Sequence, residues 1–174
     1  VVDERLDKLT ELSKSKKKIY TNITFVDIAG LVKGASKGEG LGNKFLSHIR
    51  EVDAIIHLVR CFVSENITHV NSKINPVEDL ETIKTEIILS DIDIIQKKLE
   101  KGKKKLLEEK QIKILEEKFN QLNEGKEISV NNLDEKKFLF SLGLLSIKPK
   151  IIVCNVDEGS LTNGNAFTGE VNNK

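Results

Sequence analysis

Two runs of mostly apolar residues, 54–62 and 150–155, constrain the fold of this chain most. Neither run alternates apolar with polar residues, and such runs are typical of strands that are buried on both faces of a parallel sheet. A third candidate strand covers residues 19–27, which are rich in β-branched and aromatic side chains and run into Ala29-Gly30. Glycine-rich or helical stretches separate the three runs. The sequence therefore predicts an α/β fold whose parallel sheet has crossover connections.

A long helical region, from about residue 77 to 145, separates the second and third runs. The apolar positions follow helical spacing, and those of the second half resemble a coiled-coil seam. They are Leu80, Ile83, Ile87, Ile95 and Leu99, then Ile112, Leu115, Phe119 and Leu122. We predict two antiparallel helices, the second ending at residues 123–125. A third helix is expected from about Asp134, whose side chain would cap it, to Gly143.

The composition favours a globular protein that does not cross a membrane. The chain of 174 residues carries a formal net charge of +1, so its charge alone predicts no nucleic-acid partner. No apolar stretch reaches the ~18 residues that span a bilayer, and no signal peptide opens the chain, so we predict a cytoplasmic location. Cys61 and Cys154 lie in apolar runs and are interpreted as buried hydrophobic residues. The chain has no Met, and we interpret it as an internal piece of a longer protein.

The chemistry is concentrated after the first predicted strand, which ends in the sequence Asp27-Ile28-Ala29-Gly30. In P-loop switch proteins an Asp-x-x-Gly sequence at this place directs its carboxylate to Mg²⁺ and its glycine amide to the terminal phosphate. The following residues, 31–43, include four glycines between Gly34 and Gly42. A flexible surface loop is the simpler interpretation. The position after a buried strand favours a switch segment that a bound γ-phosphate orders.

Residues 25–43, Phe-Val-Asp-Ile-Ala-Gly-Leu-Val-Lys-Gly-Ala-Ser-Lys-Gly-Glu-Gly-Leu-Gly-Asn, resemble switch II of the YchF family, the Obg-like ATPases among the TRAFAC-class P-loop NTPases. The resemblance continues through residues 49–51, 59–62 and 75–76, and more loosely to 155–158. It implies a G-domain-like parallel sheet with an inserted helical hairpin. The G domain would comprise residues 1–76 and 147–174, and the insertion residues 77–146. The phosphate-binding P-loop and the C-terminal TGS domain of the family would lie outside the chain.

The resemblance also implies a set of nucleotide contacts. Asp27 would bind Mg²⁺ through a water molecule, and Gly30 and Gly34 would belong to the phosphate-sensing switch. Leu31 stands where many GTPases have a Gln that orients the attacking water, so we assign no catalytic residue.

The sequence Asn155-Val156-Asp157-Glu158 follows the third predicted strand, where GTPases carry Asn-Lys-x-Asp. Asn155 could pair with the N6/N7 edge of adenine, and Val156 could offer apolar surface beside the ring. Glu158 replaces the Asp that reads guanine, which fits the ATP preference of the family. The simpler interpretation is that Asn155 caps the strand and that Glu158 is solvated.

A lysine-rich stretch at the predicted hairpin tip, residues 97–105, contains six lysines. Lys101, Lys103, Lys104 and Lys105 could neutralise phosphates of ribosomal RNA, although a solvated tip is the alternative. We therefore predict a switch protein that binds and hydrolyses ATP, or also GTP, with Mg²⁺ and acts on the ribosome. This piece alone is expected to be inactive. The alternative is a GTP-dependent nucleic-acid- or ribosome-binding protein with little catalysis. No membrane partner and no DNA sequence specificity are expected.

Overall fold

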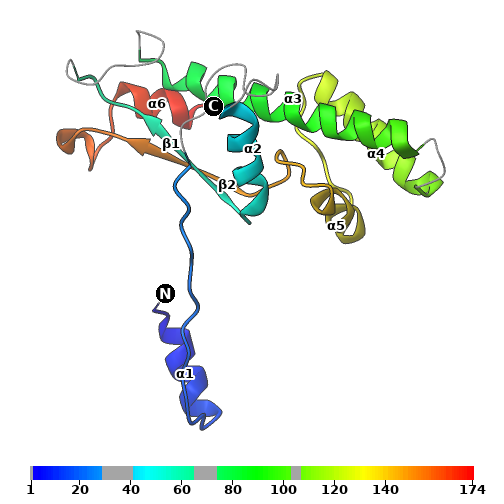
Figure 1. Cartoon of the computed structure of the whole chain (residues 1–174). Coiled ribbons are helices and arrows are strands. Elements are labelled where there is room, and N and C mark those ends of the chain that lie inside the picture. The colour runs from blue at the N-terminus through cyan, green and yellow to red at the C-terminus, as the bar shows by residue number, and fades with distance from the viewer. Residues whose placement is uncertain (1, 29–40, 65–73, 103–106) are drawn as a thin grey trace.

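The computed structural model describes residues 2–28, 41–64, 74–102 and 107–174 (Figure 1). Its helices and strands follow one another in a simple order. They are α1 (Glu4–Leu12), α2 (Leu41–Glu51), β1 (Ile55–Arg60), α3 (Pro76–Gly102), α4 (Glu109–Asn123), α5 (Leu133–Ser141), β2 (Lys150–Asn155), the 3₁₀ turn η2 (Glu158–Ser160) and α6 (Ala166–Asn172).

Strands β1 and β2 form a parallel pair, with Ile55 opposite Lys150 and Arg60 opposite Asn155. The ladder continues past β1, where the Cys61 amide donates to the Asn155 carbonyl at 2.7 Å. Helices α3, α4 and α5 lie between the two strands in the chain and supply the crossover that a parallel pair requires. The predicted parallel sheet is thus confirmed.

The sheet is buried on one face only. Val59 and Cys61 are almost fully buried in a cluster with Val171 of α6, whereas Leu58 keeps 62% of its side chain exposed and Ile151 keeps 59%. Helices α3 and α6 cover the first face, and no described element covers the second. The expectation that both runs are buried on both faces is wrong for the described part of the chain, because helices pack on one side only.

Residues 19–27 were expected to form a strand, and this prediction is wrong. The segment is extended but carries no strand, and Phe25 and Ile23 remain 76% and 62% exposed. Figure 1 shows it as a thread that runs from α1 towards the sheet. A strand is defined by hydrogen bonds to a neighbour, and no described strand lies alongside this segment. Only its end is anchored, since Ile28 packs in a cluster with α2 and α3.

Helix α3 connects the parts of the structure, because its apolar side chains contribute to three successive hydrophobic clusters along its length (Figure 1). Leu80 packs against the buried face of the sheet. Ile83 and Ile87, further along, pack against α2 and Leu145. The C-terminal half of α3 contributes Ile95 and partly buried Leu99 to the largest cluster. Its other buried members come from α4, from α5 and from the turn after α5: Leu115, Leu122, Leu139 and Leu144.

The ends of the later helices follow local rules that the sequence shows in part. Helix α4 ends at Asn123 and is followed by Gly125 with φ +71, as the predicted stop at residues 123–125 requires. Helix α5 begins at Leu133, and the Asn132 side chain accepts from the Glu135 amide at 2.9 Å. Asp134 was expected to be this cap, and that prediction is wrong by two positions because Asn132 already fills the role.

Candidate nucleotide-binding site

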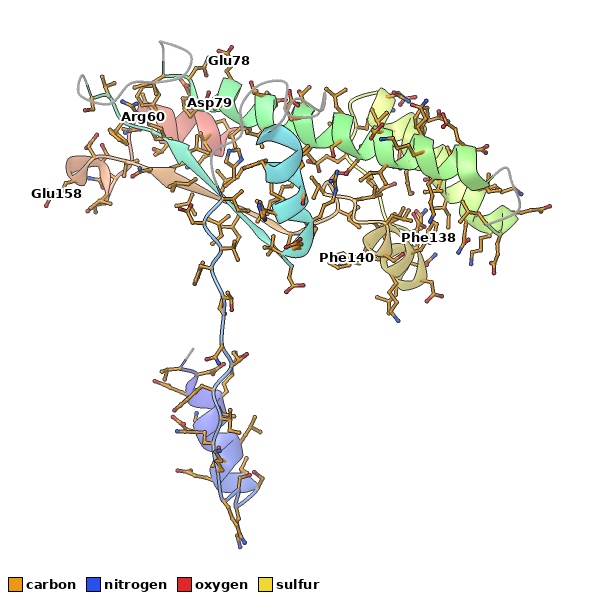
Figure 2. All side chains as sticks on the ribbon, viewed as in Figure 1. Arg60, Glu78, Asp79, Phe138, Phe140 and Glu158 are labelled. Atoms are coloured by element: carbon orange, nitrogen blue, oxygen red, sulfur yellow. The ribbon has the colours of Figure 1, made fainter. Side chains whose placement is uncertain are left out.

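The carboxyl ends of β1 and β2 meet at one edge of the sheet, where Arg60 and Asn155 are opposite each other. In open α/β sheets, ligands bind beyond the carboxyl ends of the strands. Figure 2 shows Arg60 and Glu158 in this part of the molecule. Arg60 is engaged locally, since its guanidinium donates to the carbonyls of Phe62 and Ser64 at 3.2 Å each and lies over the Phe62 ring. It therefore orders the turn after β1.

Asn155 is the last residue of β2 and Glu158 follows the strand, and both are exposed. Neither side chain has a hydrogen-bond or ion-pair partner among the residues that the structure describes. Asp157, between them, is already occupied, because its carboxylate accepts from the amide and the hydroxyl of Ser160 at 3.0 and 2.9 Å. Of the two neighbouring acids, Glu158 is the one whose carboxylate is available to a ligand.

Val156 has a different environment from its neighbours. Its side chain is partly buried against the cluster of Val59, Cys61 and Val171, beneath α6. Most of its apolar surface therefore serves the protein core, and only the remainder could lie beside a base. This packing fixes the end of β2 and so determines where Asn155 and Glu158 stand.

Asn165 fastens the loop after β2 to β1. Its side-chain amide donates to the Cys61 carbonyl at 2.7 Å, and its side-chain oxygen accepts from the Thr168 amide at 3.1 Å as the N-cap of α6. Gly164 precedes it with φ +72, and a Cβ there would stand 2.5 Å from the Thr168 hydroxyl. A non-glycine residue would thus strain this turn. The loop that carries Glu158 is consequently held at both ends.

Sequence reasoning missed Asn165, although a signal was present. The residues Asn165-Ala166-Phe167-Thr168 have the spacing of a capping box, with Asn at the cap and Thr three positions later. That pattern predicts the helix start. The link to Cys61 depends on the fold and has no sequence signature.

Asp27 is exposed at the end of the extended segment 19–28, and it has no partner among the described residues. Its neighbour Ile28 packs against α2 and α3, so the backbone at Asp27 is attached to the helices even though the carboxylate is not engaged. Exposed carboxylate oxygens are ligands that Mg²⁺ accepts, and Mg²⁺ usually binds through one or two carboxylates together with phosphates and water. The Asp27 carboxylate could therefore face a hydrated Mg²⁺ ion, with water between the carboxylate and the metal.

Other predicted site residues lie outside the described parts of the chain. These are Gly30, Leu31 and Gly34 of the glycine-rich segment and Lys103, Lys104 and Lys105 of the lysine-rich stretch; the side chain of Lys101 also lies outside. Of the remaining lysines there, Lys97 forms an exposed ion pair with Asp93 at 2.6 Å.

Among the described residues, two histidines and both cysteines are exposed or packed in the protein without a catalytic partner. His48 is exposed on α2. Burial lowers the pKa of His57, against the opposing effect of Asp79. Burial also raises the pKa of the Cys61 thiol to about 12, together with its contact to Cys154. Within the described ranges, no group of three or more His, Cys, Asp or Glu side chains could hold a metal ion, and no helix there is long and apolar enough to cross a bilayer.

Comparison with known proteins identifies the relatives of this chain. The family described as 50S ribosome-binding GTPase matches residues 7–155. The ribosome-binding ATPase YchF of Mycoplasma pneumoniae is 49% identical over 170 residues, which cover 94% of this chain and 47% of that protein. The Bacillus subtilis protein of the same name is 44% identical, with 91% of this chain and 45% of that protein covered.

A solved structure agrees with these matches. The YchF GTPase of Schizosaccharomyces pombe has a TM-score of 0.77 and 35% sequence identity, and the match covers 99% of this chain and 50% of that one. The chain spans about half the length of the relatives that it matches. The similarity extends over nearly the whole chain, helices α3 to α5 included.

Proposed function

Because the chain belongs to the YchF group of the 50S ribosome-binding GTPase family, we propose that it forms the switch and base-reading half of an ATP-hydrolysing protein. The nucleotide state of that protein would control its association with the ribosome. The observation that carries the proposal is that Asn155, at the carboxyl end of β2, and Glu158, just after it, are exposed and have no partner among the described residues. The relatives carry the words ribosome-binding ATPase in their names.

Asn155 and Glu158 would read the base. Asn155 can accept from the N6 amino group of adenine and donate to its N7. A carboxylate that faces guanine accepts from N1 and the 2-amino group, whereas adenine has an acceptor at N1 and no 2-amino group. The longer Glu158 side chain can turn towards solvent instead, while the exposed part of Val156 lies beside the ring. This arrangement favours ATP over GTP.

Asp27 would hold Mg²⁺ through a water molecule, and Gly30 and Gly34 would sense the γ-phosphate. The metal ion would neutralise charge on the phosphates when it is bound. Ile28 anchors the Asp27 backbone to α2 and α3, which keeps the carboxylate near the start of the glycine-rich segment. Leu31 cannot orient a water molecule by hydrogen bonding, so other groups would do so in the full-length protein, and turnover would be slow.

Nucleotide titration of the full-length protein tests this proposal. Fluorescent ATP and GTP analogues are titrated in parallel with Mg²⁺ into the wild type and the Glu158→Asp variant. We expect tighter ATP binding by the wild type and a shift towards GTP in the variant. Asp157→Asn is the matched control, because the Asp157 side chain is already engaged as the N-cap of η2. Equal or GTP-favoured binding by the wild type would contradict the adenine-reading role.

GTP hydrolysis is the second candidate. The matched family and the S. pombe structure both carry the word GTPase in their descriptions. The same titration distinguishes ATP hydrolysis from GTP hydrolysis as the function. Asn155 can pair with either purine, so the preference for one base is expected to depend on Glu158.

Contact with ribosomal RNA is proposed for the lysine-rich stretch. Charge reversal of Lys103, Lys104 and Lys105 should weaken ribosome co-sedimentation and reduce its dependence on salt, because each lysine that neutralises a phosphate releases a counterion. Asp27→Asn should instead alter nucleotide binding. Co-sedimentation that is unchanged by the triple variant would favour a solvated tip.

A further inference from the structure

A buried polar cluster joins three parts of the chain that are far apart in sequence: the end of α2, the middle of α3 and the segment before β2. We call it the Asp91 junction, and it consists of Arg50, Ser90, Asp91, Ser146 and Lys148. The proposed site does not use it. Charged groups are rarely buried unless they are paired or hydrogen-bonded, so the role of this cluster needs an explanation.

Asp91 is the centre of the junction and is completely buried. Its carboxylate accepts from the Leu145 amide at 2.9 Å and from the Ser146 amide at 2.8 Å, and it is also hydrogen-bonded by the Ser146 hydroxyl. One side chain of α3 thus holds the backbone of the turn that leads from α5 towards β2.

Arg50 brings α2 into the same cluster. Its guanidinium donates to the Ser90 hydroxyl at 2.6 Å, beside Asp91. Burial raises the pKa of Asp91 above its ordinary value, and the hydrogen bonds of the carboxylate and the positive charge of Arg50 oppose this effect. The aliphatic part of Arg50 passes Gly143, where a Cβ would stand 3.7 Å from it. The last turn of α2 is therefore attached to α3 by a polar contact in addition to the apolar ones.

Lys148 closes the junction from the opposite side. Lys148 is buried, with 4% of the residue exposed. Its ammonium group donates to the Arg50 carbonyl at 2.7 Å and to the Val52 carbonyl. The same group lies over the Phe140 ring. These carbonyls belong to the end of α2, where a cation also interacts favourably with the helix dipole. Two residues later the chain enters β2.

The apolar contacts around the junction connect it to the glycine-rich segment. Ile28 precedes that segment and Phe45 follows it, and both pack in the cluster that contains Ile87 of α3 and Leu145. The residues that flank 29–40 thus pack in the same apolar cluster as α2 and α3. A displacement of α2 relative to α3 would be opposed by the hydrogen bond from Arg50 to Ser90. It would also be opposed through Lys148, which holds the end of α2 to the segment that Asp91 fixes to α3.

We propose that the Asp91 junction makes α2 and α3 move as one body, so that a change of nucleotide at the glycine-rich segment reorients the α3–α4 helix pair. Arg50, Asp91 and Lys148 are positioning residues, which act through α2 and touch no nucleotide. The inference rests on the proposed function and deepens it, because it names the element that carries the response. Packed elements joined in this way shift between discrete arrangements and do not deform continuously.

Hydrogen exchange of the full-length protein tests the inference. The exchange of α2, α3 and residues 142–148 is compared between the ADP state and the state with a non-hydrolysable ATP analogue, both with Mg²⁺. Asp91→Asn keeps the shape of the side chain but replaces one carboxylate oxygen by an amide group. That group cannot accept the hydrogen bonds that the oxygen accepts from Leu145 or Ser146. Asp93→Asn is the matched control, since Asp93 lies on the exposed side of α3 and pairs with Lys97 on the surface.

In the wild type and in Asp93→Asn, we expect the analogue to change exchange in both α2 and α3. In Asp91→Asn the response of α2 should persist, while that of α3 should fall at least about fivefold, the lower end of ordinary coupling between sites. A purely structural role would raise exchange in both nucleotide states and leave their difference intact. If Asp91→Asn unfolds at the assay temperature, Ser146→Ala replaces it and removes the hydroxyl contact alone.

The inference would be overturned if the nucleotide changed the hydrogen exchange of α3 as much in Asp91→Asn as in the wild type. It would also be overturned if nucleotide bound to the wild type without any change in the exchange of α3. Both outcomes would leave the proposed function intact. A wild type that binds neither ATP nor GTP in the titration would overturn the proposed function, and the inference with it.

Discussion

The helical part of this protein, α3 to α5, contains its own core, whereas the two-stranded sheet does not. Ile95, Leu115 and Leu139 are completely buried among their helices, while Leu58 and Ile151 of the sheet keep more than half of their side chains exposed. The helices are close in sequence and bury one another with short connections. A parallel sheet depends on layers from distant parts of a chain on both faces. The contrast shows which parts of this chain can be stable without further layers.

The largest effect is expected from the buried ion pair between α4 and α5. Lys118 is fully buried, and its ammonium group lies 2.7 Å from Glu135. Lys118→Met would leave Glu135 as a buried unpaired charge, and we expect a loss of about 3–5 kcal/mol. Urea unfolding of wild type and variant measures this loss in the free energy of unfolding.

The double variant Lys118→Met, Glu135→Leu provides the control for that prediction. It removes both charges, and it should recover most of the lost stability, because an apolar pair of similar size often replaces a buried ion pair without cost. A double variant that is no more stable than Lys118→Met would contradict the explanation.

The next prediction compares the loss of stability when one leucine of each region is replaced by alanine. Leu115→Ala should cost about 2–5 kcal/mol both in the 174-residue chain and in the full-length protein. Leu58→Ala should cost less than about 0.5 kcal/mol in the chain, because Leu58 is exposed there. If the full-length protein covers the open face of the sheet, the cost of Leu58→Ala should rise there to that of a core residue. Equal small costs in both contexts would show that this face stays exposed.

A smaller effect is expected at the loop that carries Glu158. Asn165→Ala removes the cap of α6 and the hydrogen bond to the Cys61 carbonyl, and it should cost about 1 kcal/mol. We also expect weaker ATP binding by the full-length protein, because the loop is held at this point. Asn163→Ala is the control, since Asn163 is exposed two residues earlier. Asn165→Asp, which keeps the cap acceptor, separates the two hydrogen bonds.

The smallest effect concerns pH. Burial raises the pKa of Glu135, but hydrogen bonds from Lys118 and Asn131 outweigh it and leave the pKa below its ordinary value of 4.5. Its contribution to stability is therefore complete above pH 4.5 and is lost as the pH falls through the folded-state pKa. The difference in melting temperature between wild type and Glu135→Gln should narrow below that pH. A constant difference would show that Glu135 does not titrate in this way.

The sequence predicted those features that depend on local spacing. The positions of Leu115, Phe119 and Leu122 followed from helical periodicity, and Gly125 followed from its freedom to adopt a positive φ. The parallel pairing of β1 and β2 followed from their apolar character. The strand predicted at residues 19–27 failed, because an extended segment becomes a strand only beside a partner.

The polar interior was not predictable from spacing. Asp91, Lys118 and Glu135 lie on helices with many other charged residues, and nothing in the sequence distinguishes them from solvated ones. Their burial results from the way the helices pack. At the candidate site, the sequence identified Asn155 and Glu158, while the roles of Asp157 and Asn165 required the hydrogen bonds of the folded loop.

Helix α3 has a mechanical consequence that follows from its length. Its 27 residues extend about 40 Å at 1.5 Å per residue, in one uninterrupted helix. Its first turns pack on the sheet, and its last turns contain the first part of the lysine-rich stretch, residues 97–102. A tilt of about 5° at the sheet would displace the far end by about 3.5 Å over that length. The helix thus works as a lever arm that converts a small rotation near the strands into a displacement as large as an atomic contact.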